Sequence, residues 1–360
     1  MNSHPRAVAI ITGPDTLLDH IGVLSQELNI PLIVTEQETL DIAKIFYPDL
    51  NAKLINLQDL SLAFLANHFD IIFQSYRFAH MEMSSSFKLL YQKEMRFVYC
   101  PHGNSDKGFS LTHHPIQDMA LVYGEHMMSS LKTSGAVDNI QEIIVTGNYR
   151  LAFYEKHKPF YDSLTDRMLR KHLISNLETI LYAPTWEDGE NPSSFFSCCD
   201  RVIQDLQGRW NVIVKIHPLI EQLHPGQTLS ITSRYEDQPG IIFLSKFPSI
   251  YPILELADLY IGDFSSIGYD FLSFDKPLFF FNTVKQLQKN AEGCFLHQCG
   301  LSIPEDLSLN LHDFLHANKS VCQEKYQAIR KKIYQFAYGN PREMEEVKEE
   351  IFFKMKDRKV

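Results

Sequence analysis

The stretch Asp258-Leu-Tyr-Ile-Gly-Asp-Phe-Ser-Ser-Ile-Gly-Tyr-Asp-Phe-Leu-Ser-Phe-Asp-Lys-Pro-Leu-Phe-Phe-Phe281 has the pattern of a strand, a turn, a helix and a second strand. Residues 259–261 predict a buried strand, and the helix is expected over 266–274. Ser265 and Ser266 then stand at the helix start, where unpaired N–H groups and the positive end of the helix dipole favour an anion. The pattern therefore predicts a phosphate-binding turn, with simple capping of the helix by Asp263 and Ser265 as the alternative.

Apolar runs alternate with helix-like segments in both halves of the chain. In the first half, strands are expected at 8–12, 32–35, 70–74, 97–100, 120–123 and 143–146, and helix-like segments at 15–28, 37–46 and 84–94. In the second half, strands are expected at 180–183, 212–216, 241–244, 259–261 and 278–281. Since strands that alternate with helices pair in parallel, the chain is predicted to be an α/β protein with two parallel sheets.

Composition narrows the class of protein. The 360 residues suffice for two ordinary domains, and 34 basic against 44 acidic residues give a formal net charge of −10. That balance argues against a nucleic-acid partner, although a local basic site for one diphosphate remains allowed. The apolar run 7–11 is too short for a signal peptide or a membrane span, so we expect a cytoplasmic protein. The six cysteines form no CxxC pair and read as reduced thiols.

Three further motifs precede this stretch: Tyr99-Cys-Pro-His-Gly-Asn-Ser-Asp-Lys107, Tyr182-Ala-Pro-Thr-Trp-Glu-Asp188 and Val212-Ile-Val-Lys-Ile-His-Pro218. With the Asp-Phe-Ser-Ser turn and the trailing Asp275-Lys-Pro277, they resemble the CDP-glycerol glycerophosphotransferase family of teichoic-acid primases and polymerases. The likeness runs over about residues 95–285. It implies a GT-B fold, in which two Rossmann-like domains have parallel sheets facing a central cleft.

The domain boundaries follow from the pattern and the resemblance together. We expect an N-terminal Rossmann-like domain on the acceptor side over residues 1–150 and a helical linker over 151–178. A C-terminal Rossmann-like domain that binds the CDP-linked donor is expected over 179–318. The charged residues 319–360 predict terminal helices, interrupted at Tyr338-Gly-Asn-Pro341, that pack back on the first domain.

His102 is the candidate general base. A neutral imidazole near its ordinary pKa can take a proton from an acceptor hydroxyl at neutral pH. Gly103 permits close backbone approach to a ligand, and Lys107 is a secondary candidate for the donor phosphates. The family typically has His-Gly-Thr-Pro here, so the wall around the acceptor is expected to differ. Asp106 either orients the imidazole of His102 or belongs to a turn.

His217 lies at the carboxyl end of a predicted strand, where ligands of α/β sheets gather. Taken alone it reads as a loop-packing residue, but the resemblance implies a contact to the donor diphosphate that stabilises charge on the departing cytidine monophosphate. Lys215 lies on the opposite face of the strand from Ile216. Its side chain points either toward the helices that cover the sheet or beyond the edge of the sheet.

The loop after the strand at 180–183 is the last candidate segment. Pro184 ends the strand and Thr185 offers a hydroxyl to the donor. Trp186 either lines the donor site or anchors the loop as a packed aromatic. The family commonly has Trp-Arg-Asp here, and Glu187 is not expected to touch a diphosphate because a carboxylate would repel it.

The resulting hypothesis is a transferase that moves glycerol phosphate, or a similar polyol phosphate, from a CDP-linked donor to a hydroxyl of a cell-envelope glycan or lipid. Catalysis is assigned to His102 and His217, and donor binding to Ser265, Ser266, Asp263, Thr185 and Pro184. No aspartate cluster predicts a metal, the pair His113-His114 reads as a loop, and no cofactor is expected beyond the donor.

A lipid-linked acceptor allows peripheral association with the cytoplasmic face of a membrane; the oligomeric state is left open. The alternatives are a GT-B nucleotide-sugar enzyme, of the glycosyltransferase or UDP-N-acetylglucosamine 2-epimerase type, and a non-catalytic nucleotide-binding protein.

Overall fold

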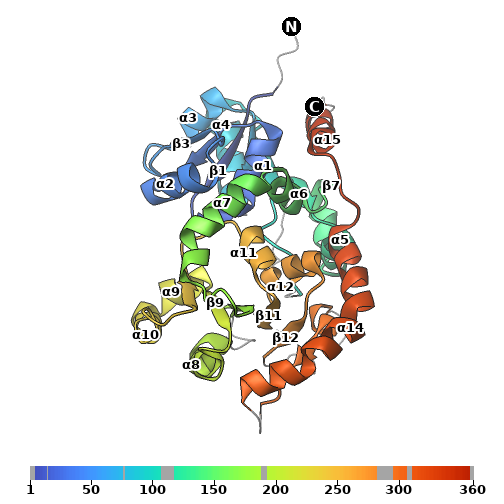
Figure 1. Ribbon diagram of the computed structural model, residues 1–360. Coiled ribbons are helices and arrows are strands. Elements are labelled where there is room, and N and C mark those ends of the chain that lie inside the picture. The colour runs from blue at the N-terminus through green and yellow to red at the C-terminus, as the bar shows by residue number, and fades with distance from the viewer. Residues whose placement is uncertain are drawn as a thin grey trace. The chain divides into compact units, whose positions relative to one another are not determined.

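The computed structural model describes residues 5–13, 15–75, 78–106, 117–187, 193–281, 295–305 and 310–356. The chain divides into two compact units, one formed by residues 1–156 with 336–360 and the other by residues 157–335. Each unit is a parallel α/β sheet with its own helices, as predicted from the alternating pattern (Figure 1).

In the first unit, the described residues form a seven-stranded sheet in the order β3-β2-β1-β4-β5-β6-β7. All neighbouring strands run parallel. The strands are β1 (Ala7–Ile11), β2 (Leu32–Val34), β3 (Ala52–Leu54), β4 (Ile71–Gln74), β5 (Arg96–Tyr99), β6 (Gln117–Val122) and β7 (Ile140–Val145). Sequence analysis missed β3 because this short strand at the sheet edge is only half-buried and lacks an apolar run.

The helices of the first unit follow its strands in the expected alternation. They are η1 (Asp15–Asp19), α1 (Ile21–Leu28), α2 (Gln37–Phe46), α3 (Leu62–His68), α4 (Phe78–Tyr91), α5 (Glu125–Thr133), η3 (Ala136–Asn139), α6 (Tyr149–Lys156) and α15 (Met344–Lys356). The single helix predicted over 15–28 is divided at His20, between η1 and α1. Helix α15 packs on α1 and β7, where Lys354 forms an ion pair with Glu142.

The second unit repeats the same topology. Its described strands lie in the order β10-β9-β8-β11-β12-β13, all parallel. They are β8 (Thr179–Ala183), β9 (Asn211–Lys215), β10 (Ile241–Leu244), β11 (Leu259–Gly262), β12 (Leu278–Phe280) and β13 (Leu301–Ser302). Because the first strand of each unit lies in the middle of its sheet and the chain then builds outward on both sides, both sheets have the strand order of a Rossmann fold.

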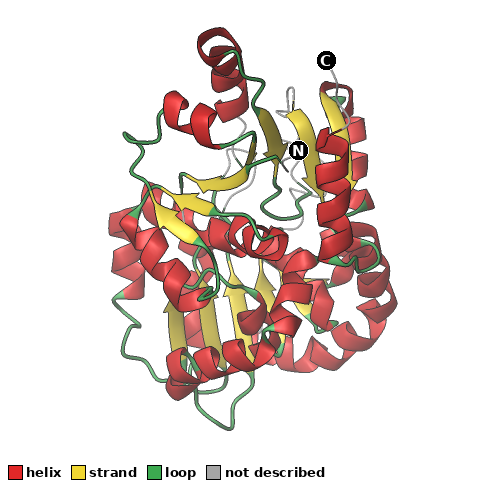
Figure 2. Cartoon of the chain, turned by 90° about the horizontal axis from the view of Figure 1, so that it is seen from above, coloured by secondary structure: helices red, strands yellow, loops and turns green. Residues whose placement is uncertain are grey.

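Helices cover the second sheet, as the red ribbons flanking yellow strands show (Figure 2). They are α7 (Lys158–Met168), η4 (Arg170–His172), α8 (Ser194–Leu206), α9 (Pro218–Leu223), α10 (Pro225–Thr232), α11 (Tyr251–Leu256), α12 (Ser266–Phe271), η5 (Leu272–Phe274), η6 (Leu296–Cys299) and α14 (Leu311–Tyr338). Helix α14 ends where the sequence predicts a break, and its last residues belong to the first unit.

The interior of each unit is an apolar cluster between sheet and helices. In the first unit, Val8, Ile33, Ile72 and Phe97 from four strands meet Phe87 of α4. In the second, side chains of β8, β9 and β11 meet α8 and the first half of α14. Burial of this surface, at roughly 25 cal/mol per Å² of apolar area, is the main force that holds each sheet to its helices.

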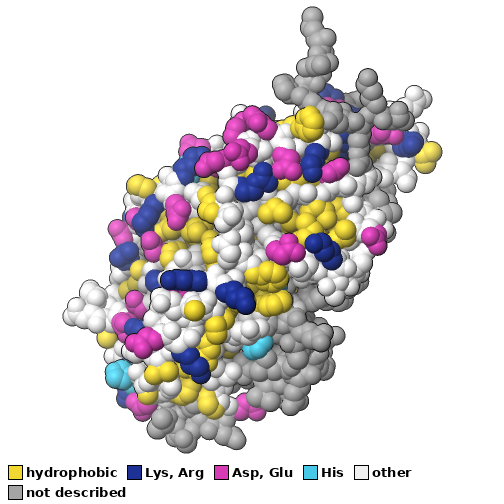
Figure 3. Space-filling view, turned by 90° about the vertical axis from the view of Figure 1, so that its right-hand side faces the viewer, with side chains coloured by type: hydrophobic (Ala, Val, Ile, Leu, Met, Phe, Trp, Pro, Cys, Tyr) yellow, Lys and Arg dark blue, Asp and Glu magenta, His cyan; other side chains and the backbone are white. Residues whose placement is uncertain are grey.

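Surface charges of both signs are interspersed on the face shown in Figure 3, where Lys and Arg alternate with Asp and Glu. Such a surface suits a protein with the net charge of this chain better than one that follows a nucleic-acid strand. None of the helices in the described ranges has the length and hydrophobicity that crossing a bilayer requires.

Candidate functional site

The predicted donor residues meet at one position in the second sheet. Strands β8 and β11 are neighbours, although the chain builds β9 and β10 on one side of β8 and β12 and β13 on the other side of β11. In open parallel sheets such a reversal leaves a crevice beyond the carboxyl ends of the two strands, and ligands bind there. Pro184 and Thr185 continue β8, while Asp263 and Ser265 continue β11, so the register places both loops at this crevice.

Asp263 ties the two loops together. One oxygen of its carboxylate accepts hydrogen bonds from the Thr185 amide at 2.9 Å, the Ser194 amide at 3.1 Å and the Ser194 hydroxyl at 3.0 Å. The side chain is buried. The carboxylate thus fixes the Thr185 loop and the start of α8, and the phosphate contact predicted for Asp263 stays a prediction.

Two buried tyrosines complete this support, and sequence analysis found neither. The hydroxyl of Tyr260 donates to the Asp263 carbonyl at 3.0 Å and lies 3.3 Å from the Ser265 hydroxyl. The Tyr182 hydroxyl lies 3.0 Å from that of Ser194. Both tyrosines look like ordinary apolar strand residues in the sequence; the available signal is that a buried tyrosine hydroxyl needs a polar partner.

Ser265 and Ser266 stand at the start of α12, as predicted, and both are half-buried. Ser265 has the extended backbone of an N-cap residue (φ −134°, ψ 168°), yet within the described part its side chain makes no capping hydrogen bond to α12. The capping alternative is thus not seen for Ser265. The serine hydroxyls lie beside the first amides of α12, and their contact to the donor phosphates stays a prediction.

His217 follows β9, the strand next to β8, and is half-buried. Its Nδ1 accepts a hydrogen bond from the Leu219 amide at 3.2 Å, which caps α9. Because Nδ1 provides the lone pair, the proton of the neutral ring lies on Nε2, which is the donor nitrogen of this ring. The ring also lies near Trp186, with centroids 6.3 Å apart.

The remaining donor candidates of the second unit are more enclosed. Pro184 and Thr185 are buried, and the Thr185 amide is the group that Asp263 holds. Trp186 packs partly against the apolar cluster, as its anchoring interpretation predicted. Lys215 is 5% exposed and lies on the face of β9 opposite Val214 and Ile216. The donor contacts proposed for these residues stay predictions.

The Asp275-Lys276-Pro277 motif has a structural role. Arg330 of α14, fully buried, donates to the Asp275 carboxylate at 2.8 Å, and Gln327 donates to its other oxygen at 2.9 Å. The ammonium of Lys276 donates to the carbonyls of Glu255 and Ala257 at the end of α11. Desolvation lowers the pKa of Lys276 below its ordinary value. This motif therefore attaches α14 and the end of α11 to the segment that follows α12.

In the first unit, His102 lies in the loop after β5, and its side chain is exposed. Gly103 has φ 130°, in the region that residues with a side chain rarely adopt, so the loop requires glycine there. The protein around the loop desolvates the imidazolium form and lowers the pKa of His102 below its ordinary value. The ring is therefore neutral at neutral pH, as a general base must be before it takes a proton.

The His102 loop is fastened at its far end. Asp106 lies 3.1 Å from Nε2 of His126 in α5, within hydrogen-bonding distance, so this carboxylate helps to attach the loop. Asn104 is fully buried, and its side-chain amide reaches the carbonyl of Ala337 at 3.4 Å. Asn104, at the position where the family typically has threonine, thus supports the loop, and the expected change of the acceptor wall stays a prediction.

Lys107, Asp188 and the pair His113-His114 lie outside the described residues. Within the described ranges, no group of three or more His, Cys, Asp or Glu side chains is arranged to hold a metal ion. The five cysteines in these ranges are free thiols.

Comparison with known proteins identifies the family to which this chain belongs. A family model described as CDP-Glycerol:Poly(glycerophosphate) glycerophosphotransferase matches residues 115–352, well over half of the chain. The match includes Thr185, His217, Ser265 and Ser266 but begins after His102.

Two curated relatives from Bacillus spizizenii match parts of the chain. The teichoic acid glycerol-phosphate primase is 27% identical over 147 residues, which cover 41% of this chain and 35% of the primase. The teichoic acid poly(ribitol-phosphate) polymerase is 24% identical over 189 residues, which cover 51% of this chain and 28% of the polymerase. The matched segments thus span about a third of the length of these relatives.

Solved structures show the same fold. The wall teichoic acid polymerase TagF superposes with a TM-score of 0.67 at 15% identity, covering 98% of this chain and 90% of that one. UDP-GlcNAc 2-epimerase from Neisseria meningitidis superposes with a TM-score of 0.57 at 12% identity, covering 96% of this chain and 99% of the epimerase. At these identities the likeness concerns the fold, and it confirms the predicted GT-B class.

Proposed function

Because the chain belongs to the CDP-glycerol:poly(glycerophosphate) glycerophosphotransferase family, we propose that it transfers glycerol phosphate from CDP-glycerol to a hydroxyl acceptor in cell-wall glycan synthesis. The observation that carries the proposal is the crevice between β8 and β11. There Asp263 holds the Thr185 loop beside the uncapped turn of Ser265 and Ser266, within the segment that the family model matches.

The donor side of the reaction belongs to the second unit. The hydroxyls of Ser265 and Ser266 and the first amides of α12 bind the diphosphate of the donor. His217 contributes a hydrogen bond from Nε2–H, the tautomer that its cap of α9 supports. These donors act in a fixed geometry, so they stabilise the charge that moves onto cytidine monophosphate without having to reorient.

The acceptor side belongs to the first unit. We assign His102 as the general base, which takes the proton of the acceptor hydroxyl. The hydroxyl oxygen forms a bond to the β-phosphorus, and the bond from that phosphorus to cytidine monophosphate breaks. The lowered pKa of His102 supports this role, because the ring is unprotonated at neutral pH. No metal takes part in this scheme, and dialysis against a chelator should leave the rate unchanged.

Ligand-dependent unfolding tests the donor. CDP-glycerol should raise the unfolding temperature, since a ligand that binds only the folded state stabilises it by an amount that grows with the logarithm of concentration over Kd. CMP should protect less, because it lacks the second phosphate and the alcohol. CDP-ribitol serves as a second CDP-alcohol and UDP-N-acetylglucosamine as the competing class. Protection by the UDP-sugar without protection by either CDP-alcohol would replace the proposal with a nucleotide-sugar enzyme.

The anion-binding turn has its own test. Replacing both Ser265 and Ser266 by Ala should weaken CDP-glycerol binding by roughly 1.5–3 kcal/mol for each charge-assisted hydrogen bond removed. Ser233→Ala, at an exposed serine at the end of α10, is the matched control and should bind as the wild type does. Unchanged affinity in a folded double variant would remove these serines from the donor site.

A further inference from the structure

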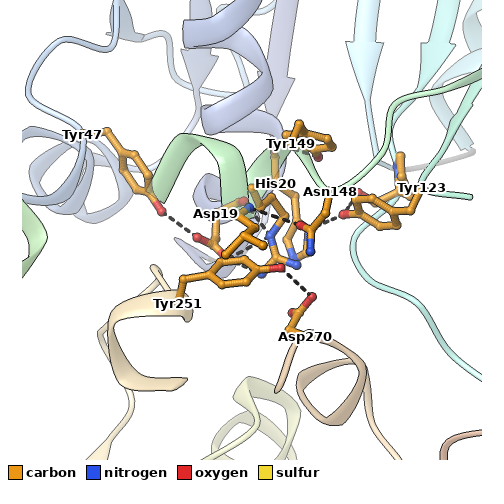
Figure 4. A network of polar contacts seen from close by, with 11 residues as sticks. Asp19, His20, Tyr47, Tyr123, Asn148, Tyr149, Tyr251 and Asp270 are labelled. Atoms are coloured by element: carbon orange, nitrogen blue, oxygen red, sulfur yellow. Dashed lines mark hydrogen bonds and ion pairs between the residues drawn. The ribbon is translucent and has the colours of Figure 1, made fainter. Parts of the chain in front are cut away.

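His20 is a histidine that sequence analysis did not single out, and it lies beside the His102 loop within the first unit. Its Nδ1 is 2.9 Å from the hydroxyl oxygen of Tyr123. That hydroxyl donates to the carbonyl of Pro101 at 3.4 Å. Since Pro101 is bonded to His102, a path of two hydrogen bonds joins His20 to the residue before the proposed base. Figure 4 shows His20 and Tyr123 in this network.

The contacts of Tyr123 occupy Nδ1 of the His20 ring. The Tyr123 hydroxyl lies 2.9 Å from Nδ1, donates to the Pro101 carbonyl at 3.4 Å and also forms a hydrogen bond with Tyr149. Nδ1 is therefore engaged in either tautomer of the neutral ring. The other nitrogen, Nε2, has no hydrogen-bond partner among the described residues. His20 is only half-buried, so this nitrogen can meet a ligand.

The position of His20 is fixed by its surroundings. The hydroxyl of Tyr149 donates to the His20 carbonyl at 3.3 Å, and the rings of Tyr149 and Tyr123 stack with centroids 5.7 Å apart. The preceding residue, Asp19, forms a buried ion pair with Arg150, whose Nε also donates to the Asp19 carbonyl at 3.0 Å. Figure 4 shows Asp19, His20, Tyr123 and Tyr149 close together. The backbone of His20 is thus held at its carbonyl and the ring at Nδ1.

The surroundings also keep the ring uncharged. Burial lowers the pKa of His20 well below its ordinary value, and the positive charges of Arg150 and of a protonated His102 lower it further. The ionisable groups around the ring are Asp19, His102, Tyr123, Tyr149 and Arg150. When His102 accepts a proton, the neighbouring His20 therefore remains neutral.

We propose that Nε2 of His20 forms a hydrogen bond with a second hydroxyl of the acceptor, near the hydroxyl that His102 deprotonates. The inference rests on the proposed function and deepens it, because it makes the acceptor a polyol with two neighbouring hydroxyls. His20 takes no proton from the reaction. It is a specificity residue that aligns the acceptor, and Tyr123 is the positioning residue that orients its ring.

The test compares two acceptors that differ by one hydroxyl, with CDP-glycerol as the donor. Methyl glycerol phosphate has two neighbouring hydroxyls, and methyl 3-hydroxypropyl phosphate has only the primary one. The wild type should prefer the diol in kcat/KM by about threefold to tenfold, the scale of one neutral hydrogen bond. His20→Asn retains an amide near the position of Nδ1 but has no group at Nε2. It should raise KM for the diol and abolish the preference.

Three measurements keep the interpretation specific. Calorimetric affinity for CDP-glycerol should not change in His20→Asn, because His20 does not touch the donor in this scheme. His20→Gln places a carbonyl near the position of Nε2 and should recover part of the preference. His68→Asn is the matched control: this exposed histidine of α3 also bonds through Nδ1, to the Phe64 carbonyl, and its loss should change nothing.

The outcomes separate this inference from the proposed function. Absence of transfer by the wild type from CDP-glycerol to either acceptor would refute the proposed function itself. Transfer to both acceptors by the wild type, with the diol preference retained in His20→Asn, would overturn the role of His20 alone. Loss of the preference in both His20→Asn and His20→Gln, with lower unfolding temperatures, would make His20 a structural residue and also overturn the proposal.

Discussion

Asp263→Asn is the sharpest test of the donor crevice, because one carboxylate oxygen of Asp263 holds both loops. Asparagine keeps the shape and an oxygen at the same position but removes the charge. A hydrogen bond to a charged acceptor contributes about 1.5–3 kcal/mol and one to a neutral acceptor about 0.5–1.5 kcal/mol, a difference of about 1 kcal/mol. Over the three bonds to Thr185 and Ser194, the second unit should lose about 2–3 kcal/mol of stability.

Asp263→Ala should cost more than Asp263→Asn. It leaves the buried amides of Thr185 and Ser194 without their acceptor, and each unsatisfied group costs about 1–3 kcal/mol. Donor affinity should fall in both variants, because the Thr185 loop is no longer fixed beside the serine turn.

Urea unfolding followed by tryptophan fluorescence is the assay. Both tryptophans of the chain, Trp186 and Trp210, lie in the second unit, so the signal reports the unit that carries Asp263. Asp237→Asn is the control, since this residue is exposed and should change stability by less than about 0.5 kcal/mol. An Asp263→Asn protein as stable as the wild type, or no less stable than the control, would refute the assigned network.

Three other predictions concern catalysis, the attachment of α14 and acid stability. His102→Ala should lower the single-turnover rate of transfer by about a hundredfold or more, with the affinity for CDP-glycerol retained. His217→Ala should weaken both the calorimetric affinity for CDP-glycerol and turnover. Full activity of His102→Ala would refute the assignment of His102 as the general base. Arg330→Lys should destabilise the second unit by about 1–3 kcal/mol in urea unfolding, because lysine cannot reproduce the forked contacts to Asp275, and wild-type stability would refute this role. Burial alone would raise the pKa of Asp70, but hydrogen bonds from Arg6 and Lys93 lower it to about 2 from an ordinary 3.8. The ionised carboxylate therefore stabilises the fold above about pH 4, and this contribution is lost as the pH falls toward 2. The stability difference between wild type and Asp70→Asn, about 1 kcal/mol or less for so exposed a group, should shrink over that interval, and a difference that grows instead would reverse the sign of the linkage.

The parts of the site that the sequence revealed are those encoded locally. Ser265 and Ser266 follow an apolar run and precede a helix, and His217 follows a strand and precedes a proline. In each case a few consecutive residues show where the strand ends. The rule that ligands bind at the carboxyl edge of a parallel sheet then marks these residues as candidates for the site. The same rule placed Asp263 at the crevice but could not give the direction of its side chain, which depends on Ser194 of another helix.

His20 and Tyr123 were missed for the opposite reason. They are 103 residues apart in the sequence, and they meet only in the folded first unit, where His20 follows η1 and Tyr123 follows β6. Neither belongs to a recognisable motif, and a histidine within a run that reads as one continuous helix gives no sign that the helix is divided at that residue. Long-range polar contacts of this kind depend on packing, which the pattern of apolar residues specifies only in outline.

Helix α14 explains the Asp-Lys-Pro motif within the second unit. Arg330 attaches the helix to Asp275, directly after α12 and η5, the elements that follow the serine turn. The motif therefore holds a helix that lies 55 residues further along the chain. In the first unit, the carbonyl of Ala337, near the end of the same helix, accepts a hydrogen bond from Asn104 and so supports the loop that carries the proposed base.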